Sequence, residues 1–103
     1  MINEKSFYEK CYSILKKVPK GKITTYKEIA NALGTKAYRT VGNAMNKNPY
    51  APNVACHRVV NSNGNVGGFA SGNKKKIEML KKEGIKIKGK KIQNINKFLY
   101  RFN

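Results

Sequence analysis

Acidic residues are scarce in this sequence of 103 residues: five of them stand against 22 Lys and Arg, which gives a formal net charge of +17. A chain with so few carboxylates predicts a polyanionic partner, and nucleic acid is the default candidate. The alternative is that the lysines, which supply most of the cations, only solvate the surface. We favour nucleic acid because an excess of positive charge this large is typical of proteins that contact phosphates.

Long apolar runs are also lacking. No stretch approaches the ~18 apolar residues that a membrane-spanning helix needs, and the N-terminus has no signal-peptide core. We therefore expect a cytoplasmic protein, nucleoid-associated in a prokaryote, without a membrane partner. Apolar residues make up 40% of the chain, which is enough for a single hydrophobic core. We expect one domain over residues 1–103 that acts as a monomer.

Histidine and cysteine are few, since the chain has one His and two Cys. No metal-ligand spacing, phosphate-binding glycine loop or internal repeat is present, so we expect neither a metal nor a cofactor. Cys11 and Cys56 could form one disulfide, but a reducing compartment and the histidine beside Cys56 favour free thiols. Cys11 falls on the apolar stripe of a predicted helix, which indicates core packing.

The segment 53–60 sets a thiol directly beside the only histidine. A thiol with an ordinary pKa of about 8.5 is mostly protonated at neutral pH, and a nearby base or positive field raises its reactive fraction. His57 can supply the base and Arg58 the field. The alternative is a strand that enters the core with Cys56 as a small buried hydrophobe, and a Cys-His dipeptide alone favours that alternative. Neighbours on an extended strand point to opposite faces, so a contact between Cys56 and His57 needs a local turn or a bridging water.

Capping patterns predict two helices near the N-terminus. Residues 6–9 form a capping box at the start of a helix over about 7–17, which should end ahead of Pro19. A second capping box at 25–28 starts a short helix that Gly34 stops.

A third helix should follow with Thr35 as its cap. Its apolar residues share one face: Ala37, Val41, Ala44 and Met45. Arg39, Asn43 and Asn46 point the other way, and Gly42 would let another backbone approach closely. Two short helices joined by a glycine-containing turn are typical of a helix-turn-helix. We favour contact with DNA over an ordinary helical hairpin because of the net charge.

The C-terminal half alternates strand and helix patterns. Val59-Val60 suits a strand, and the Asn-Gly turn at 62–65 predicts that a hairpin or wing follows. Asn73 can cap a core helix that Gly84 ends, residues 85–88 alternate like a short strand, and an amphipathic helix closes the tail. The apolar residues of that helix are Ile95, Phe98, Leu99 and Phe102. The whole pattern predicts an α+β domain, mostly helical and winged-helix-like, with a short β hairpin.

Several motifs along the chain fall into one register. They are Lys20-Gly21-Lys22-Ile23-Thr24-Thr25-Tyr26, Arg39-Thr40-Val41-Gly42-Asn43-Ala44, Asn48-Pro49, Cys56-His57-Arg58-Val59-Val60, Ser62, Gly64, Gly67-Gly68-Phe69 and Glu83-Gly84. Together they resemble the C-terminal domain of the O6-alkylguanine-DNA alkyltransferases. The resemblance covers about residues 7–84 at matching spacings, with 85–103 as a tail that packs on that domain, and it indicates a single-domain form of the family.

The resemblance implies a repair protein that flips O6-alkylguanine out of double-stranded DNA and moves the alkyl group onto a cysteine in one turnover. It makes Cys56 the acceptor, His57 the activating base and Glu83 the residue that orients His57. Tyr26 would help to rotate the nucleotide and would donate a proton or hydrogen bond to the leaving base. Arg39 would fill the gap in the base stack.

The resemblance also implies contact with the minor groove, which suits the small residues of the third helix. The residues that match DNA-contacting positions are Tyr26, Lys27, Thr35, Arg39, Gly42, Asn43 and Ser62. Asn48, Val54 and Phe69 match the surroundings of the base pocket. Asn48 would link the DNA-binding helix to the reactive loop, and Phe69 would form a wall.

Two features differ from the usual family pattern. Ala55 stands where the family usually has proline, and residues 85–103 look more like the tail of the alkyltransferase-like proteins. Those relatives bind the lesion without transferring its alkyl group, and they lack the cysteine, whereas Cys56 is present here.

Two alternative functions remain beside repair by transfer. The first is a non-enzymatic lesion sensor that hands damaged DNA to another repair pathway. The second is a winged-helix transcription regulator, which would explain the charge and the helices but would leave Cys56, His57 and Glu83 without a purpose.

Overall fold

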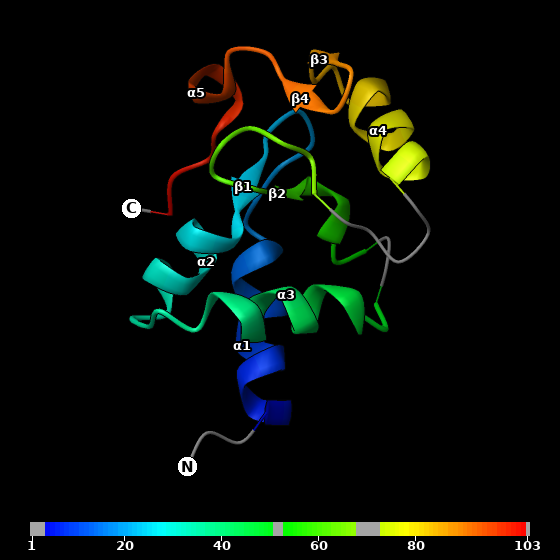
Figure 1. Ribbon diagram of the computed structural model, residues 1–103. Coiled ribbons are helices and arrows are strands. Elements are labelled where there is room, and N and C mark those ends of the chain that lie inside the picture. The colour runs from blue at the N-terminus through cyan, green and yellow to red at the C-terminus, as the bar shows by residue number, and fades with distance from the viewer. Residues whose placement is uncertain (1–3, 51–52, 68–72, 103) are drawn as a thin grey trace.

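The computed structural model describes residues 4–50, 53–67 and 73–102 (Figure 1). In those ranges the protein is mostly helical with small two-stranded sheets, which confirms the predicted fold class. The helices are α1 (Glu4–Leu15), α2 (Tyr26–Ala32), α3 (Tyr38–Asn46), the 3₁₀ turn η1 (Cys56–Arg58), α4 (Asn73–Lys82) and α5 (Ile95–Phe98). The strands are β1 (Thr24–Thr25), β2 (Val59–Val60), β3 (Ile87–Lys88) and β4 (Lys91–Ile92). None of the helices in these ranges is long and apolar enough to cross a lipid bilayer.

Helix α1 follows the predicted apolar stripe, but both of its ends differ from the prediction. It begins at Glu4, so Ser6 lies inside the helix and the predicted capping box there is wrong. The helix ends at Leu15, where a tighter turn leads to Pro19: the Val18 N–H donates to the Leu15 carbonyl oxygen at 3.0 Å.

Helices α2 and α3 form the predicted helix-turn-helix. The Glu28 N–H donates to Thr25 Oγ1 at 3.0 Å, which confirms the cap of α2. Gly34 has a φ of +72°, a left-handed conformation that glycine adopts readily, and it follows the end of α2. The predicted cap at Thr35 is wrong, because α3 begins after Ala37. The Thr35 hydroxyl instead accepts the Ala37 N–H at 3.2 Å, a local turn that competes with helix capping.

The first hydrophobic core lies between α1, α2 and α3 (Figure 1). The inward face of α3 is the predicted one, since Val41 and Ala44 are buried and Arg39 is exposed. The Tyr12 hydroxyl donates to the Ala44 carbonyl oxygen at 2.8 Å and so ties α1 to α3. Cys11 is fully buried, and burial raises the pKa of its thiol to about 11, which confirms its packing role.

Strand β2 pairs in parallel with β1, so that Thr24 lies opposite Val59. The predicted hairpin that continues β2 through the 62–65 turn is therefore wrong. The turn itself forms, with a hydrogen bond of 2.9 Å from the Gly64 N–H to the Asn61 carbonyl oxygen. A turn signal is local and does not select a strand partner, whereas the buried side chains of β1 and β2 do.

The hairpin forms further along the chain, between β3 and β4. These strands are antiparallel, with Ile87 opposite Ile92 and Lys88 opposite Lys91. The predicted strand over 85–88 is thus confirmed in its second half.

A second hydrophobic core lies between β2, α4, the hairpin and the tail. Gly84, with a φ of +91°, follows the end of α4 as predicted. Helix α5 is shorter than predicted because the chain becomes extended after Phe98 and pairs with Ile23. The Ile23 N–H donates to the Phe98 carbonyl oxygen at 2.9 Å, and the Tyr100 N–H donates to the Ile23 carbonyl oxygen at 2.8 Å. The members of this core are Ile23, Val60, Val66, Leu80, Ile85, Ile92 and Phe98.

Replacing the cap of α2 should lower stability. We expect Thr25→Ala to reduce the free energy of unfolding by about 1 kcal/mol, because a helix amide loses its acceptor. Thr25→Ser should retain most of that stability, and Thr35→Ala, which removes a turn bond rather than a helix cap, should cost less. Urea denaturation measures all three variants, and equal losses for Thr25→Ala and Thr35→Ala would contradict the assignment of the cap.

Candidate functional site

Residues 56–58 form a 3₁₀ turn rather than an extended strand, so the local turn that the Cys-His pair requires is present. The Cys56 N–H donates to the Val54 carbonyl oxygen at 2.9 Å, and the Arg58 N–H donates to that of Ala55 at the same distance. Ala55 has a φ of −84°, close to the value that proline fixes, so the alanine keeps a backbone that the family's proline would favour. Cys56 and His57 are both buried, and Cys56 is a free thiol.

Asn48 braces the connector between α3 and this turn. Its side-chain amide donates to the Val54 carbonyl oxygen at 2.7 Å, and its Oδ1 accepts the Tyr50 N–H at 3.0 Å. One amide therefore links the residues that follow α3 to the backbone two residues before Cys56. This geometry suits the hinge position expected of Asn48.

Glu83, just beyond α4, contacts both residues that follow Cys56. His57 Nε2 lies 3.0 Å from Glu83 Oε2. Arg58 donates through Nε to Oε1 at 2.9 Å and through Nη2 to Oε2 at 2.8 Å, while its Nη1 donates to the Val18 carbonyl oxygen at 2.9 Å. The expected pairing of Glu83 with His57 is present in the geometry. The guanidinium fork of Arg58 on the same carboxylate was not foreseen from the sequence.

This arrangement sets the protonation of the cluster. Burial by itself raises the pKa of Glu83, but hydrogen bonds from Arg58 and His57, together with their charges, outweigh it and hold the pKa below its ordinary value. Burial also lowers the pKa of His57, more than the neighbouring carboxylate raises it. His57 is therefore neutral at pH 7. Because an ionised carboxylate only accepts, the proton of the imidazole is on Nε2 and the lone pair is on Nδ1.

Lys76 is a buried cation that sequence reasoning missed. It is 0% exposed, and its Nζ donates to the Val59 carbonyl oxygen at 2.6 Å. Burial lowers its pKa to about 8, while the charge of Cys56 acts in the opposite direction. Lys76 is thus a buried amine that contacts the backbone three residues after Cys56. Helical spacing from Leu80 and Glu83 places Lys76 on the inner face of α4, and this spacing was the signal available in the sequence.

Tyr26 is the first residue of α2 and is half-buried. Burial raises the pKa of its phenol, and the charge of Cys56 raises it further. The phenol therefore keeps its proton at neutral pH and lies close enough to Cys56 to interact with it electrostatically. Such a group can donate a hydrogen bond to a base that approaches the thiol.

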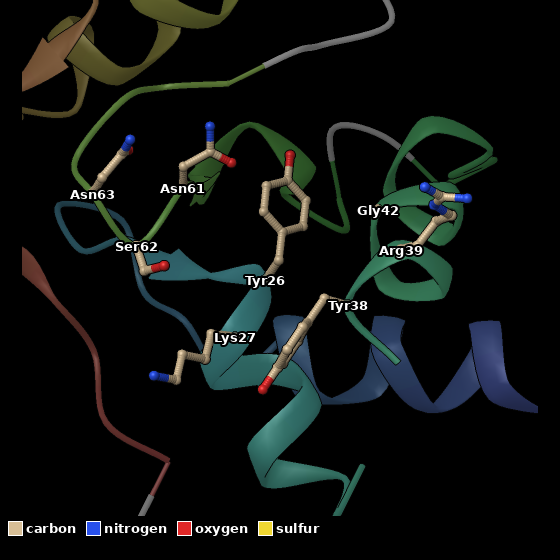
Figure 2. Close-up of a pocket in the computed structure, with 8 residues that line it drawn as sticks. All are labelled: Tyr26, Lys27, Tyr38, Arg39, Gly42, Asn61, Ser62 and Asn63. Atoms are coloured by element: carbon tan, nitrogen blue, oxygen red, sulfur yellow. The ribbon is translucent and has the colours of Figure 1, made fainter. Parts of the chain in front are cut away.

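A groove of about 510 Å³ opens beside Tyr26 between α2, α3 and the loop that follows β2 (Figure 2). Figure 2 shows the Tyr26 ring between Asn61 of the loop and Arg39 of α3. The residues that line the groove are Tyr26, Lys27, Tyr38, Arg39, Gly42, Asn61, Ser62 and Asn63. Five of these were predicted to contact DNA, while Tyr38, Asn61 and Asn63 were not. A side chain added at Gly42 would meet nothing within 4 Å, so the glycine leaves open space at the groove.

The remaining predicted residues lie elsewhere. Thr35 lines a separate hollow of about 400 Å³ at the turn between α2 and α3. Asn43 is exposed on the outer face of α3, and Val54 is fully buried in the first core. Phe69 lies outside the described residues.

The family match and the similar proteins agree with one another. The family described as 6-O-methylguanine DNA methyltransferase, DNA binding domain, matches residues 6–85. A methylated-DNA–protein-cysteine methyltransferase of Saccharolobus islandicus is 49% identical over 71 residues, which cover 69% of this chain and 46% of that protein. The chain thus spans about half the length of the curated relatives it matches.

Two solved structures are also similar. The O6-methylguanine-DNA methyltransferase of Pyrococcus kodakaraensis matches with a TM-score of 0.71 and 44% identity, over 77% of this chain and 46% of that one. S. pombe Atl1, solved in complex with damaged DNA containing O6-carboxymethylguanine, matches with a TM-score of 0.84 and 30% identity, over 97% of this chain and 99% of that one. The second match extends over the tail as well as the region around Cys56.

The buried lysine should give the protein an identifiable pH dependence. In the folded state the pKa of Lys76 is lowered from 10.5 to about 8, so the unfolded chain binds this proton more tightly between those pH values. Stability should therefore rise with pH across that window, by up to about 3 kcal/mol for this group. In Lys76→Met the contribution disappears. We expect urea denaturation to show that the difference in free energy of unfolding between the parent protein and Lys76→Met changes from pH 8 to 10. A constant difference would contradict the lowered pKa of Lys76.

Proposed function

The chain belongs to the O6-methylguanine-DNA methyltransferase family through its DNA-binding domain, and on this premise we propose that it transfers the alkyl group of O6-alkylguanine in DNA to the Cys56 thiol. The observation that carries the proposal is the set of ionisable groups around that thiol. His57 follows Cys56 in η1, and both Lys76 and Tyr26 interact with the charge of Cys56. Each molecule would act once and need no cofactor.

The first requirement of the transfer is a thiolate. His57 can take the thiol proton on Nδ1, since its Nε2 is occupied by Glu83. The resulting imidazolium would be stabilised by the Glu83 carboxylate, which Arg58 keeps ionised. The ammonium of Lys76 adds a positive charge that favours the thiolate without being consumed.

The second requirement is a stabilised leaving group. The Cys56 sulfur forms a bond to the alkyl carbon while the bond between that carbon and the guanine oxygen breaks, and the electron pair of the broken bond remains on guanine. Tyr26 keeps its proton and would donate it, or a hydrogen bond, to the departing base. The product is a thioether on Cys56, which has no easy route back to a thiol, so the protein is consumed by the reaction.

The third requirement is access to a base that is paired inside a duplex. The target nucleotide must be flipped out of the stack, at a cost of a few kcal/mol. The groove beside Tyr26 offers an entrance, and Arg39 on its rim could occupy the space that the nucleotide leaves. The open space at Gly42 would allow the DNA backbone to approach α3 in the minor groove. We propose that a monomer binds double-stranded DNA in this way.

A non-enzymatic lesion sensor is the second candidate function. The observation in its favour is the match to Atl1, which extends over nearly the whole of both chains, including the tail. Cys56 and the groups around it favour the transfer. The two candidates differ in one measurable property, which is whether the mass of the protein changes.

The decisive measurement is intact mass after incubation with an excess of duplex containing O6-methylguanine. We expect each molecule to gain one methyl group and no more, and peptide mapping should place it on Cys56. Cys11 should remain unmodified because burial raises the pKa of its thiol to about 11. Cys56→Ala should bind the lesion but repair nothing, and Cys11→Ala should still gain the methyl group. Tight binding of lesion DNA by the unaltered protein without any change in mass would replace the methyltransferase proposal with the sensor.

Arg39 should matter most when a base has been flipped. We expect Arg39→Ala to weaken binding to lesion duplex by at least about tenfold, since unstacking costs a few kcal/mol and 1.4 kcal/mol is a factor of ten. Binding to undamaged duplex should change much less. Arg39→Lys keeps the charge and serves as the matched control. Equal losses on the two duplexes, measured by fluorescence anisotropy, would reduce Arg39 to a phosphate contact.

A further inference from the structure

The β3–β4 hairpin is a strongly basic surface that the proposed transfer does not use. Residues 86–92, called here the lysine hairpin, contain four lysines and no carboxylate. Lys86, Lys88, Lys90 and Lys91 are all exposed. In the part of the chain that the structure describes, none of the four forms an ion pair. The hairpin also lies beyond residues 6–85, which the family match covers.

The pairing of the two strands brings like charges together. Ile87 lies opposite Ile92, which is buried in the second core, and Lys88 lies opposite Lys91. Since side chains alternate between the faces of a strand, the two lysines lie on the outer face. Like charges directly opposite each other destabilise an antiparallel pair. An anion bound across Lys88 and Lys91 would remove that repulsion.

The lysine hairpin is fixed directly to the loop that borders the groove. The Ile92 N–H donates to the Gly64 carbonyl oxygen at 2.8 Å, and the Val66 N–H donates to the Lys90 carbonyl oxygen at 2.9 Å. The Lys91 side chain packs on Gly64, where an added Cβ would lie 3.5 Å from Lys91 Cγ. Residues 61–63 at the other end of the same loop line the groove (Figure 2). Backbone hydrogen bonds therefore hold the hairpin to the loop whose other end lines the groove.

We propose that the lysine hairpin binds phosphates of the same DNA duplex, on one flank of the lesion, beyond the reach of α2, α3 and the 61–63 loop. The inference rests on the proposed function, because the lesion fixes where the duplex lies. The longest dimension of the protein is 41 Å, or about 12 base pairs at 3.4 Å each. The hairpin and α3 lie toward opposite ends of the fold (Figure 1). A duplex centred on Arg39 would thus have to extend by up to about one helical turn to reach the hairpin.

The outer face of the hairpin fits phosphate better than the hollow beneath its turn. That hollow, of about 480 Å³, lies between α4 and the turn and includes Lys74, Lys81 and Lys90, but Glu78 lines it as well. A carboxylate in that place disfavours a polyanion. Lys88 and Lys91 have no such neighbour on their strands.

Three duplexes with one O6-methylguanine each test the proposal. One extends about ten base pairs, one helical turn, on both sides of the lesion, and each of the others is cut short on one side. The test variant carries Lys88→Gln, Lys90→Gln and Lys91→Gln, and a second variant has Arg at the same three positions. The control variant carries Lys10→Gln, Lys16→Gln and Lys17→Gln, which removes the same charge from exposed positions on and after α1. All binding is measured in a Cys56→Ala background so that no transfer occurs.

We expect the test variant to lose affinity only on duplexes that keep one particular flank. Three lost phosphate contacts should reduce the slope of log K against log salt by about 2.7. Between 200 and 50 mM salt the parent protein should therefore gain about 40-fold more affinity than the test variant. On the duplex that lacks this flank the two should bind alike. The Arg variant should behave as the parent does.

Two outcomes would overturn the proposal. If the test variant loses the same affinity on all three duplexes, or no more affinity than the control variant loses, the effect comes from net charge alone. If the test variant loses no affinity on any duplex, the hairpin does not contact DNA. Methyl transfer by the test variant with Cys56 restored is measured separately by intact mass at saturating DNA. A normal mass gain without flank dependence would reject the hairpin contact and leave the proposed function standing, whereas absence of any mass gain in the parent protein would reject the function itself.

Discussion

The structure around Cys56 depends on the hydrogen bonds that the Glu83 carboxylate accepts. The carboxylate accepts from His57 and from two nitrogens of Arg58, whose third nitrogen reaches the Val18 carbonyl oxygen. Three segments far apart in sequence, the residues after α1, the η1 turn and the end of α4, are thereby joined around one anion. Removing one partner of this part-buried group leaves a partly desolvated charge without its counter-ion, which destabilises the fold. The orientation of His57 and the stability of the turn are therefore set by the same contacts.

Parallel pairing of β1 with β2 places the turn that contains Cys56 next to helices α2 and α3. β1 leads directly into α2, so Tyr26 follows the residue that pairs with Val60, and β2 directly follows the η1 turn that contains Cys56. Asn48 adds a second link from the end of α3 to the backbone at Val54. The groove and the Cys56 thiol are thus carried by directly connected elements, so a nucleotide bound in the groove would be held in a fixed relation to the thiol. The buried Lys76 of α4 donates to the Val59 carbonyl oxygen and so ties α4 to the strand that follows the Cys56 turn.

Much of this site follows from local sequence patterns. Helical spacing identified the inward face of α3, and the Thr25 cap fixed the start of α2. The role of Cys56 as the nucleophile rests on the Cys-His pair together with the family resemblance, and it stays a prediction. The predicted cap failed at Thr35 because its hydroxyl accepts from the Ala37 N–H in a local turn instead. It failed at Ser6 because α1 begins two residues earlier, at Glu4. The wall role of Phe69 stays a prediction, since that residue lies outside the described ranges.

The sequence by itself determined the basic charge, which is a sum over all residues, and the helix periods, which depend on neighbours within about four residues. Only the tertiary structure decided the partner of β2, the fork of Arg58 on Glu83 and the burial of Lys76. Each of those features joins segments more than fifteen residues apart, such as Lys76 and Val59, for which the separation is 17. Contacts of that kind depend on how the two hydrophobic cores pack against each other, and periodicity along a single segment carries no information about packing between segments.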